Sequence, residues 1–257
     1  MRSLSSGKLP RKAGICTPLV GKPWIRVSVD ITGPHPRSSK SNQYILTLVD
    51  HFSKWAEAVP LRNHTAPTVA RALMTHVFSR FVAPLQLLAD RGSEFESKLF
   101  QELMKWMKID KLRTTAFHPS CNGVVERFHK TLNSMLAKSV KESQRDLEER
   151  LPIVLAAYRA TPHESTGFTP NKLFQHEVRK PIDLVMGLPP EEPKEGMTTG
   201  DYLINLYQSS AEAYQLARKH LRANAERRKK EYNVKVKVEE FKVGNLLLPK
   251  AFSVVFD

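Results

Sequence analysis

The chain has 257 residues, enough for one substantial domain with an appendage or for two small domains, and its 41% hydrophobic content excludes an intrinsically disordered chain. Cys16 and Cys121 exclude a disulfide framework, and because neither belongs to a C-x-x-C pair they give no indication of zinc. The formal net charge of +14 favours a polyanionic partner such as nucleic acid, although a ribosomal or merely soluble basic protein would show the same balance.

Residues 1–18 are predicted to be a flexible basic arm, since Lys and Arg recur at this end of the chain and Asp30 is the first acidic residue. An ordinary solvated tail also explains this pattern. From Trp24 onward apolar and polar residues alternate with a period of two, which predicts a strand that Gly33 and Pro34 end.

Further strands and several helices are predicted after this first strand. Two strands joined by a short turn come next, at 44–49 and 54–59, so the first three strands predict an antiparallel meander. Beyond them the apolar spacing predicts a helix from Thr65 to Phe81, a strand at 85–89, a helix at 95–107, a strand at 111–116, a long helix from about Val124, and helices at 147–158 and 170–175. This order of elements indicates a mixed α/β fold.

The composition changes after the proline-rich residues 189–193, which indicates a linker. We therefore expect one domain at 19–190, a linker with a basic helix at 191–237, and the start of a small β unit at 238–257. The cations of the basic helix could contact phosphate, and a solvated helical spacer would have the same composition.

Three acidic residues stand at positions that favour chemistry. Asp30 lies on the polar face of an apolar-rich strand, where a carboxylate is costly unless it is paired or binds a metal. Asp90 directly follows a predicted strand, and the ends of strands commonly carry functional residues. Glu126 lies near the start of the long helix, on a face that also carries Asn122, Lys130 and Asn133.

Three carboxylates can hold two hard divalent cations such as Mg²⁺, and a two-metal site activates the attacking oxygen and stabilises the leaving oxygen in phosphoryl transfer. Each acid taken alone is also explained as a surface carboxylate or a helix N-terminal acid, and three acids occur by chance in a chain of this length. Asp50, Glu57 and Glu94 also lie near the predicted strands, and we interpret them as structural because their spacing does not fit the triad.

The spacing and the surrounding motifs resemble those of retroviral and retrotransposon integrases. Counting the residues between them, 59 separate Asp30 from Asp90 and 35 separate Asp90 from Glu126, which resembles the D,D-35-E pattern of that family. Similar motifs accompany the acids, in chain order PW at 23–24, VDHFSKW at 49–55, ADRGSEF at 89–95, TTAFHP at 114–119 and NGVVER at 122–127. The motifs HESTGFTP at 163–170 and PID at 181–183 resemble the downstream signature of the Ty3/Gypsy-type branch.

The resemblance covers roughly residues 19–190 and implies an RNase H-like catalytic core, a mixed five-stranded sheet flanked by helices. It implies a nuclease and polynucleotidyl transferase that uses two Mg²⁺ or Mn²⁺ ions, held by Asp30, Asp90 and Glu126, for 3′-end processing and strand transfer of retroelement DNA. It also places four residues near the DNA, namely His118, Asn122, Arg127 and Lys130. A loop-capping role also explains His118, and plain solvation also explains Lys130.

The resemblance further implies that the partners are double-stranded DNA, both element ends and target, and other copies of the chain. Action on chromosomal DNA implies a nuclear location, with a cytoplasmic stage before import. A membrane partner is not expected, because no apolar run is long enough to span a bilayer and no signal peptide follows Met1.

Three departures from the family pattern leave rival hypotheses open. The sequence before the core has no room for the usual zinc-binding His-His-Cys-Cys domain, Ser120 stands where Gln is common, and the C-terminal SH3-like unit is expected to be incomplete. A truncated or domesticated integrase that binds DNA or protein without catalysis is therefore the alternative function. A third hypothesis is an RNase H-like nuclease acting on RNA–DNA hybrids, against which the Ty3/Gypsy-like motifs argue.

Overall fold

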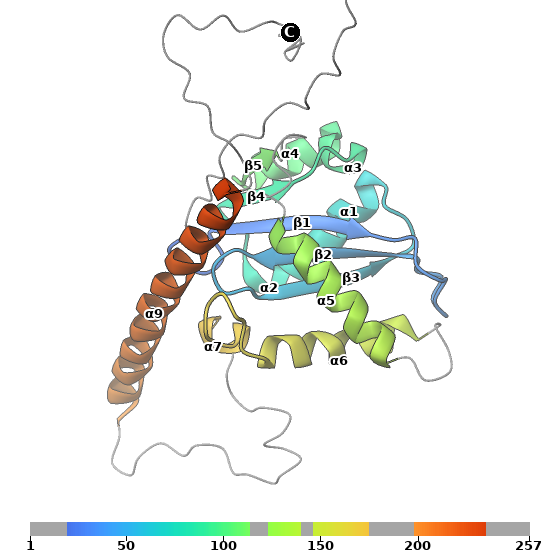
Figure 1. The fold of residues 1–257 in the computed structure, drawn as a ribbon. Coiled ribbons are helices and arrows are strands. Elements are labelled where there is room, and N and C mark those ends of the chain that lie inside the picture. Colours follow the sequence, from blue (N-terminus) through green and yellow to red (C-terminus); the bar gives the residue numbers. More distant parts are fainter. Residues whose placement is uncertain (1–19, 114–122, 140–145, 175–197, 235–257) are drawn as a thin grey trace, which may run out of the picture.

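The structure is a computed structural model that describes residues 20–113, 123–139, 146–174 and 198–234 (Figure 1). The predicted basic arm at 1–18, residues 191–197 and 235–237 of the predicted linker with its basic helix, and the predicted β unit at 238–257 lie outside the described residues.

A mixed five-stranded sheet forms the centre of the molecule. Its first three strands, β1 (Arg26–Thr32), β2 (Tyr44–Asp50) and β3 (Ala56–Leu61), pair antiparallel in chain order, which confirms the predicted meander. The strands β4 (Gln86–Ala89) and β5 (Asp110–Arg113) extend the sheet in parallel on the other side of β1. The strand order is β3-β2-β1-β4-β5, so β1 is central and the mixed α/β prediction is confirmed.

Helices cover both faces of the sheet, and two of them begin where the sequence favours it. Thr65 occupies the N-cap of the first helix, which has proline in its first turn. The Ser97 hydroxyl caps the helix that begins at Lys98 by accepting a hydrogen bond from the Phe100 amide. The helices are α1 (Ala66–Ala72), the π-helical η1 (Leu73–Phe78), α2 (Ser79–Phe81), α3 (Ser93–Glu96), α4 (Lys98–Trp106), α5 (Gly123–Ser139), α6 (Leu147–Ala160), α7 (Pro170–Leu173) and α9 (Thr199–Val234).

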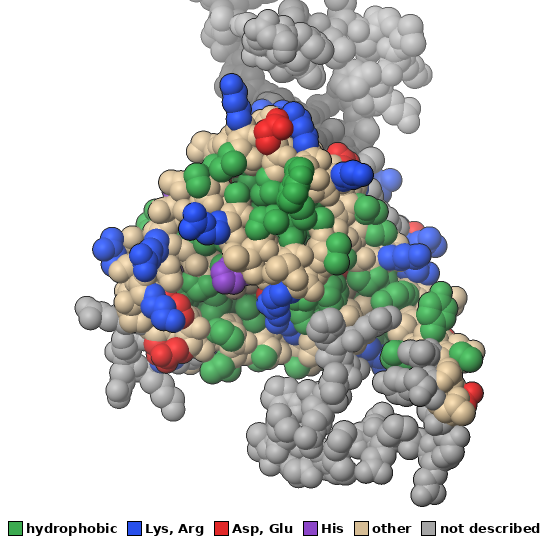
Figure 2. All heavy atoms as spheres, turned by 180° about the vertical axis from the view of Figure 1, so that it is seen from behind, with side chains coloured by type: hydrophobic (Ala, Val, Ile, Leu, Met, Phe, Trp, Pro, Cys, Tyr) green, Lys and Arg blue, Asp and Glu red, His purple; other side chains and the backbone are tan. Residues whose placement is uncertain are grey.

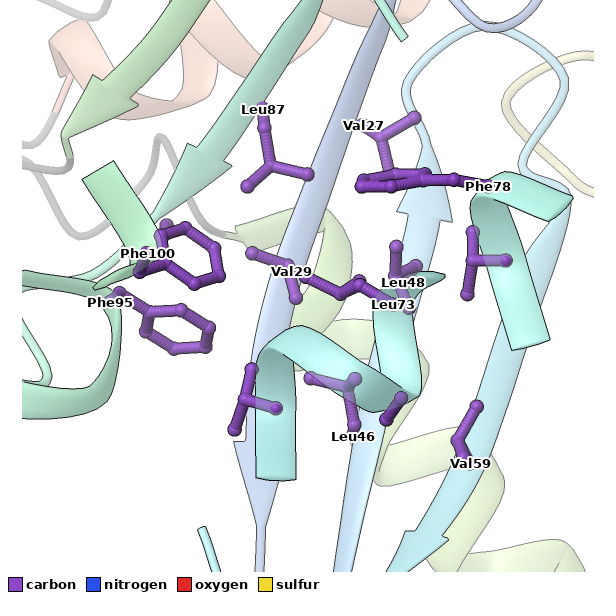
Figure 3. Packing of buried hydrophobic residues seen from close by; sticks show 14 of the residues in the cluster. Val27, Val29, Leu46, Leu48, Val59, Leu73, Phe78, Leu87, Phe95 and Phe100 are labelled. Carbon is purple, nitrogen blue, oxygen red and sulfur yellow. The ribbon is translucent and has the colours of Figure 1, made fainter. Parts of the chain in front are cut away.

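The larger core lies between one face of the sheet and the helices α1, η1 and α4. Figure 3 shows Val27 and Val29 of β1 and Leu46 and Leu48 of β2 pointing toward these helices. Because side chains alternate along a strand, the residues between them point to the opposite face. Asp30 therefore belongs to the other side of the sheet.

The helices α5 and α6 cover that other side. The core beneath these two helices contains Ile45 and Val49, which point to this face of β2, and the apolar stripe of α5. The stripe predicted for α5 is confirmed, with Val125, Phe128 and Leu132 buried. Figure 1 shows α5 crossing the near face of the sheet, where it contacts both β1 and β2.

The long helix α9 packs on the core along part of its length. Ala213, Ala217 and Leu221 are spaced four residues apart and form a third cluster with Phe52 and Leu173. Hydrogen bonds hold the same segment, with the Arg218 side chain donating to the Gly21 carbonyl at 2.7 Å. This part of α9 is a packed element, which its composition did not reveal. In the described ranges no helix combines the length and apolar character needed to cross a bilayer.

Candidate active site

Asp30 occupies the middle of the sheet on the face that α5 covers. It is paired with Thr47 across β1 and β2, and its Oδ1 accepts a hydrogen bond from the Ile31 amide at 2.8 Å. Its side chain is 22% exposed, so it can be reached from solvent. Strand alternation is thus sufficient to direct this carboxylate out of the apolar core.

The Asp30 carboxylate lies in a concentrated negative field. Its pKa is raised from 3.8 to about 6, chiefly by burial; the hydrogen bond from the Ile31 amide lowers it, and the charges of Asp90, Glu126 and Glu94 contribute to the rise in that order. The three acids of the predicted triad therefore share one electrostatic neighbourhood, although they are far apart in the sequence.

Asp90 reaches this neighbourhood because it follows the end of β4, the strand parallel to β1. Its Oδ1 accepts a hydrogen bond from the Gly92 amide at 2.9 Å. A Cβ on Gly92 would lie 3.1 Å from that oxygen and 2.9 Å from Glu94 Oε1. Glycine thus allows the two carboxylates to approach the same turn of backbone.

Glu126 stands in the first turn of α5 and is exposed. An acid there is favoured by the partial positive charge of the helix N-terminus. Glu94, which the sequence led us to interpret as structural, lies close enough to add its repulsion to Asp30. The charges of three other carboxylates thus reach Asp30.

His129 is a member of the site that sequence reasoning missed. Its Nδ1 lies 3.7 Å from Asp30 Oδ2, and its Nε2 lies 2.6 Å from the Thr47 hydroxyl, which itself donates to the Asp30 carbonyl. Burial lowers the pKa of His129 to about 4, so the ring is neutral at pH 7 and does not neutralise Asp30. Its position three residues after Glu126, on the same side of the helix, is the signal that could have found it.

The predicted DNA-binding residues are described only in part. His118 and Asn122 lie outside the described residues. Arg127 and Lys130 are both exposed on α5, immediately after and one turn after Glu126. The acids at Asp50 and Glu57 have structural partners, as expected: Asp50 accepts hydrogen bonds from the Trp24 amide and from Ser53, and Glu57 pairs with Arg159 at 2.7 Å.

The chemistry of the donor set fits a hard divalent cation. Asp30, Asp90 and Glu126 are oxygen ligands, and their mutual repulsion is the condition that a bound cation relieves. As the side chains stand, no three His, Cys, Asp or Glu groups within the described ranges are close enough together to hold a metal ion. Binding would therefore require these carboxylates to turn toward one point.

Comparison with known proteins identifies the core. Residues 22–119 match the family model described as the integrase core domain. The retrovirus-related Pol polyprotein from transposon 412 of Drosophila melanogaster is 30% identical over 228 residues, covering 87% of this chain and 18% of the polyprotein. The Gypsy retrotransposon integrase-like protein 1 of Mus musculus is 30% identical over 179 residues, covering 70% of this chain and 33% of that protein.

A solved structure shows the same fold. A chain in the simian T-cell lymphotropic virus intasome, in complex with PP2A regulatory subunit B56 gamma, matches with a TM-score of 0.53 and 19% identity, covering 76% of this chain and 66% of that chain. The mixed five-stranded sheet flanked by helices is thus the RNase H-like fold of retroviral integrase cores, as predicted. The chain spans less than a fifth of the length of the transposon 412 polyprotein.

Proposed function

Because residues 22–119 belong to the integrase core domain family, a family of polynucleotidyl transferases in DNA integration, we propose a specific reaction for this chain. It is a divalent-metal-dependent enzyme that performs 3′-end processing and strand transfer of retroelement DNA. Asp30, Asp90 and Glu126 are its catalytic and metal-binding residues. Its partners are duplex DNA and further copies of the chain, and it acts in the nucleus.

One observation carries this proposal, namely the convergence of carboxylates on Asp30 in a protein of net charge +14. Clustered carboxylates repel one another, and a protein that only needed a stable fold would gain nothing from the cluster. The nearby His129 is neutral at pH 7 and leaves the repulsion uncompensated. Divalent cations of the Mg²⁺ type would compensate it.

The residues of the chain have separate roles in the proposed reaction. Asp30, Asp90 and Glu126 would hold two Mg²⁺ or Mn²⁺ ions, which supply activation of the attacking oxygen and charge stabilisation of the leaving oxygen. Arg127 and Lys130, next to Glu126 on α5, would bind the phosphates of the strand and orient it, as would His118 and Asn122. His129 and Thr47 hold the Asp30 segment of β1 in place.

The two steps use the same site and form no covalent link to the protein. Water attacks a phosphodiester near the end of the element DNA, and the bond to the 3′ oxygen of the retained strand breaks. The released 3′-hydroxyl then attacks a phosphodiester of the target, and the target's own 3′ oxygen leaves. Catalysis is mainly positioning and charge stabilisation, which agrees with a site composed of acids and cations.

A second function is favoured by the position of the side chains. Although the charges of the acids reach Asp30, no three of them lie close enough within the described ranges to hold a metal, and a chain that binds DNA or protein without catalysis would not need them to. This alternative keeps the positive charge and the fold but gives no role to Asp90.

A nicking and strand-transfer assay on labelled duplex oligonucleotides separates these functions. It is run with Mg²⁺, with Mn²⁺ and with chelator, beside Asp90→Asn. We expect products only with metal, and a loss of at least about a thousandfold in the variant, since loss of a carboxylate ligand removes the cation that stabilises the transition state. Equal activity of Asp90→Asn would refute the triad, and DNA binding without any product would establish the binding module.

A further inference from the structure

A cationic pocket lies on the side of α5 that faces α6 and α9. Its volume is about 480 Å³, and it lies between the turn after β2, the first half of α5, the segment after α6 and the C-terminal half of α9. Four cationic side chains from three separate parts of the chain line it, Lys54, Arg127, Lys130 and Arg228. Aliphatic and aromatic side chains complete the wall, among them Val124, Phe128 and Tyr158.

Lys54 gives the pocket a buried cation. Its residue is only 7% exposed, and its Nζ donates to the His51 carbonyl at 2.6 Å. Its pKa is lowered to about 8, chiefly by burial; the charge of Asp50 raises it, and the charges of Arg228 and Arg127 contribute to the lowering. The Asp50 carboxylate, whose charge favours the protonated lysine, is itself held by hydrogen bonds from Trp24 and Ser53, and the Lys54 ammonium donates to a neutral carbonyl.

The cations of the pocket repel one another. Arg127 of α5 and Arg228 of α9 line the same cavity as Lys54 and Lys130, so four positive charges surround one space. His163, at the rim, has its pKa lowered to about 4 by burial and then by Lys54, Arg127 and Arg228, with Glu164 opposing. Glu164 also pairs with Arg227 at 3.1 Å, so the acid at the rim is shared with a cation outside the pocket. An anion in the pocket would relieve this repulsion.

The docking of α9 directs Arg228 toward the core. Ala217, Leu221 and Arg228 are four and seven residues apart, so they lie along one face of the helix. Two hydrogen bonds fix the rotation of α9 about its own axis. His220 Nδ1 lies 2.9 Å from the Thr166 carbonyl, and the Asn224 side-chain amide donates to the Ser165 carbonyl at 3.4 Å. Arg222 lies next to Leu221 and, like Arg228, is exposed, but it lines a separate hollow of about 500 Å³ formed by residues of α9 alone.

We propose that this pocket binds a phosphate of the DNA backbone, with Arg228 supplied by α9 and Lys54 and Arg127 by the core. This inference rests on the proposed function. It extends the proposed DNA-binding surface beyond the site formed by Asp30, Asp90 and Glu126. Arg127 directly follows Glu126, so a strand held at the acids would reach the pocket along α5. The apolar part of the wall suits the sugar that joins two phosphates, which favours DNA over a free polyphosphate.

Among the residues that the structure describes, the opposite face of the molecule shows no such concentration (Figure 2). Figure 2 shows Lys and Arg side chains scattered there among apolar and polar ones. A net charge of +14 alone would give diffuse binding to any polyanion. The pocket predicts instead one defined phosphate contact on the α5 side.

The test compares Arg228→Gln with Arg222→Gln, which removes the same charge from the same helix outside the pocket. Binding of the full chain to a fluorescent duplex is measured by anisotropy across a salt series in chelator, and circular dichroism checks the fold. We expect Arg228→Gln to weaken binding about tenfold at low salt and to reduce the slope of log K against log salt by about 1. Arg222→Gln should change affinity by less than about twofold, because a distant surface charge is screened.

A second measurement identifies the phosphate. Duplexes that each carry one uncharged methylphosphonate are bound by the wild type and by Arg228→Gln. A methylphosphonate at one position should weaken duplex binding by the wild type and leave binding by Arg228→Gln unchanged. This result is expected when the two changes remove the same contact. Equal effects of the two arginine variants, or independent effects at every position, would overturn the proposal. The proposal would also be overturned if tripolyphosphate stabilised the protein only when Arg228 is present, while no single methylphosphonate position showed an effect on DNA binding that depends on Arg228.

These outcomes are separate from catalysis. Binding in chelator requires neither metal nor product, so a protein without strand-transfer activity could still show the coupling to Arg228. Conversely, active protein without that coupling would remove the pocket from the DNA surface and leave the catalytic proposal standing.

Discussion

At the scale of single residues, Asp30 shows how a site can be costly to the fold that carries it. Burial and the neighbouring acids raise its pKa from 3.8 to about 6, so the folded protein holds this proton more tightly than the unfolded chain. Without metal, the stability of the protein therefore falls as the pH rises from about 4 to about 6, and the loss persists above that range.

Asp30→Asn should remove this loss, because the amide carries no charge and its oxygen can still accept the bond from the Ile31 amide. In chelator at pH 7 we expect the variant to be more stable by about 1–3 kcal/mol, and near pH 4 to equal the wild type. Urea unfolding at the two pH values measures the difference. Addition of Mg²⁺ should stabilise the wild type and not the variant, and a variant no more stable than the wild type at pH 7 would contradict the prediction.

At the scale of elements, an ion pair joins α6 to the edge strand β3. The buried Glu57 pairs with Arg159 of α6 at 2.7 Å, and the Arg159 guanidinium also donates to the Ala56 carbonyl and lies 4.3 Å from the centre of the Trp55 ring. Arg80 reaches the same carboxylate at 3.6 Å from a side chain that is 56% exposed. The two arginines thus differ in burial but share one partner.

Arg159→Met should therefore destabilise the protein by about 3 kcal/mol, because Glu57 would lose its buried partner and the Ala56 carbonyl its donor. Arg80→Met is the matched control and should cost less than about 1 kcal/mol, as is usual for exposed pairs. Chemical denaturation of both variants decides the matter. Similar losses for the two would show that burial of Arg159 does not set the strength of this connection.

At the scale of the whole molecule, the docking of α9 completes the surface that we propose to contact DNA. Ala217 is fully buried against the core, and its small side chain lets the helix approach Phe52 and Leu173. Only when this face is docked does Arg228 line the cationic pocket. Neither the core nor α9 alone forms the complete cationic pocket.

Ala217→Asp should release α9, because burying an unpaired carboxylate costs several kcal/mol. Ala223→Asp introduces the same charge at an exposed position and should leave the helix docked. Limited trypsin digestion reports the difference, since α9 carries many Lys and Arg, and we expect cleavage within it to accelerate about tenfold or more in Ala217→Asp alone. Equal digestion of the two variants would mean that α9 is not held by this face.

Much of the core was predictable because local patterns report it. The alternation around Asp30 sets which face of β1 carries the carboxylate, and the stripe of Val125, Phe128 and Leu132 orients α5. The mixed order of strands and helices followed from the same periodicities. The π-helical turn η1 within the second half of the first predicted helix was not predicted, because π-helical hydrogen bonding leaves no distinct apolar period.

By itself the sequence determined the family of the core, its order of strands and helices, and the three acids that we propose as the catalytic triad, because these depend on spacing along the chain. Only the tertiary structure decided which other groups meet them. Glu94 and His129 beside Asp30, and Arg228 beside Lys54 and Arg127, come together through the pairing of strands and the docking of α9. Such contacts join residues distant in the chain, and no local periodicity encodes them.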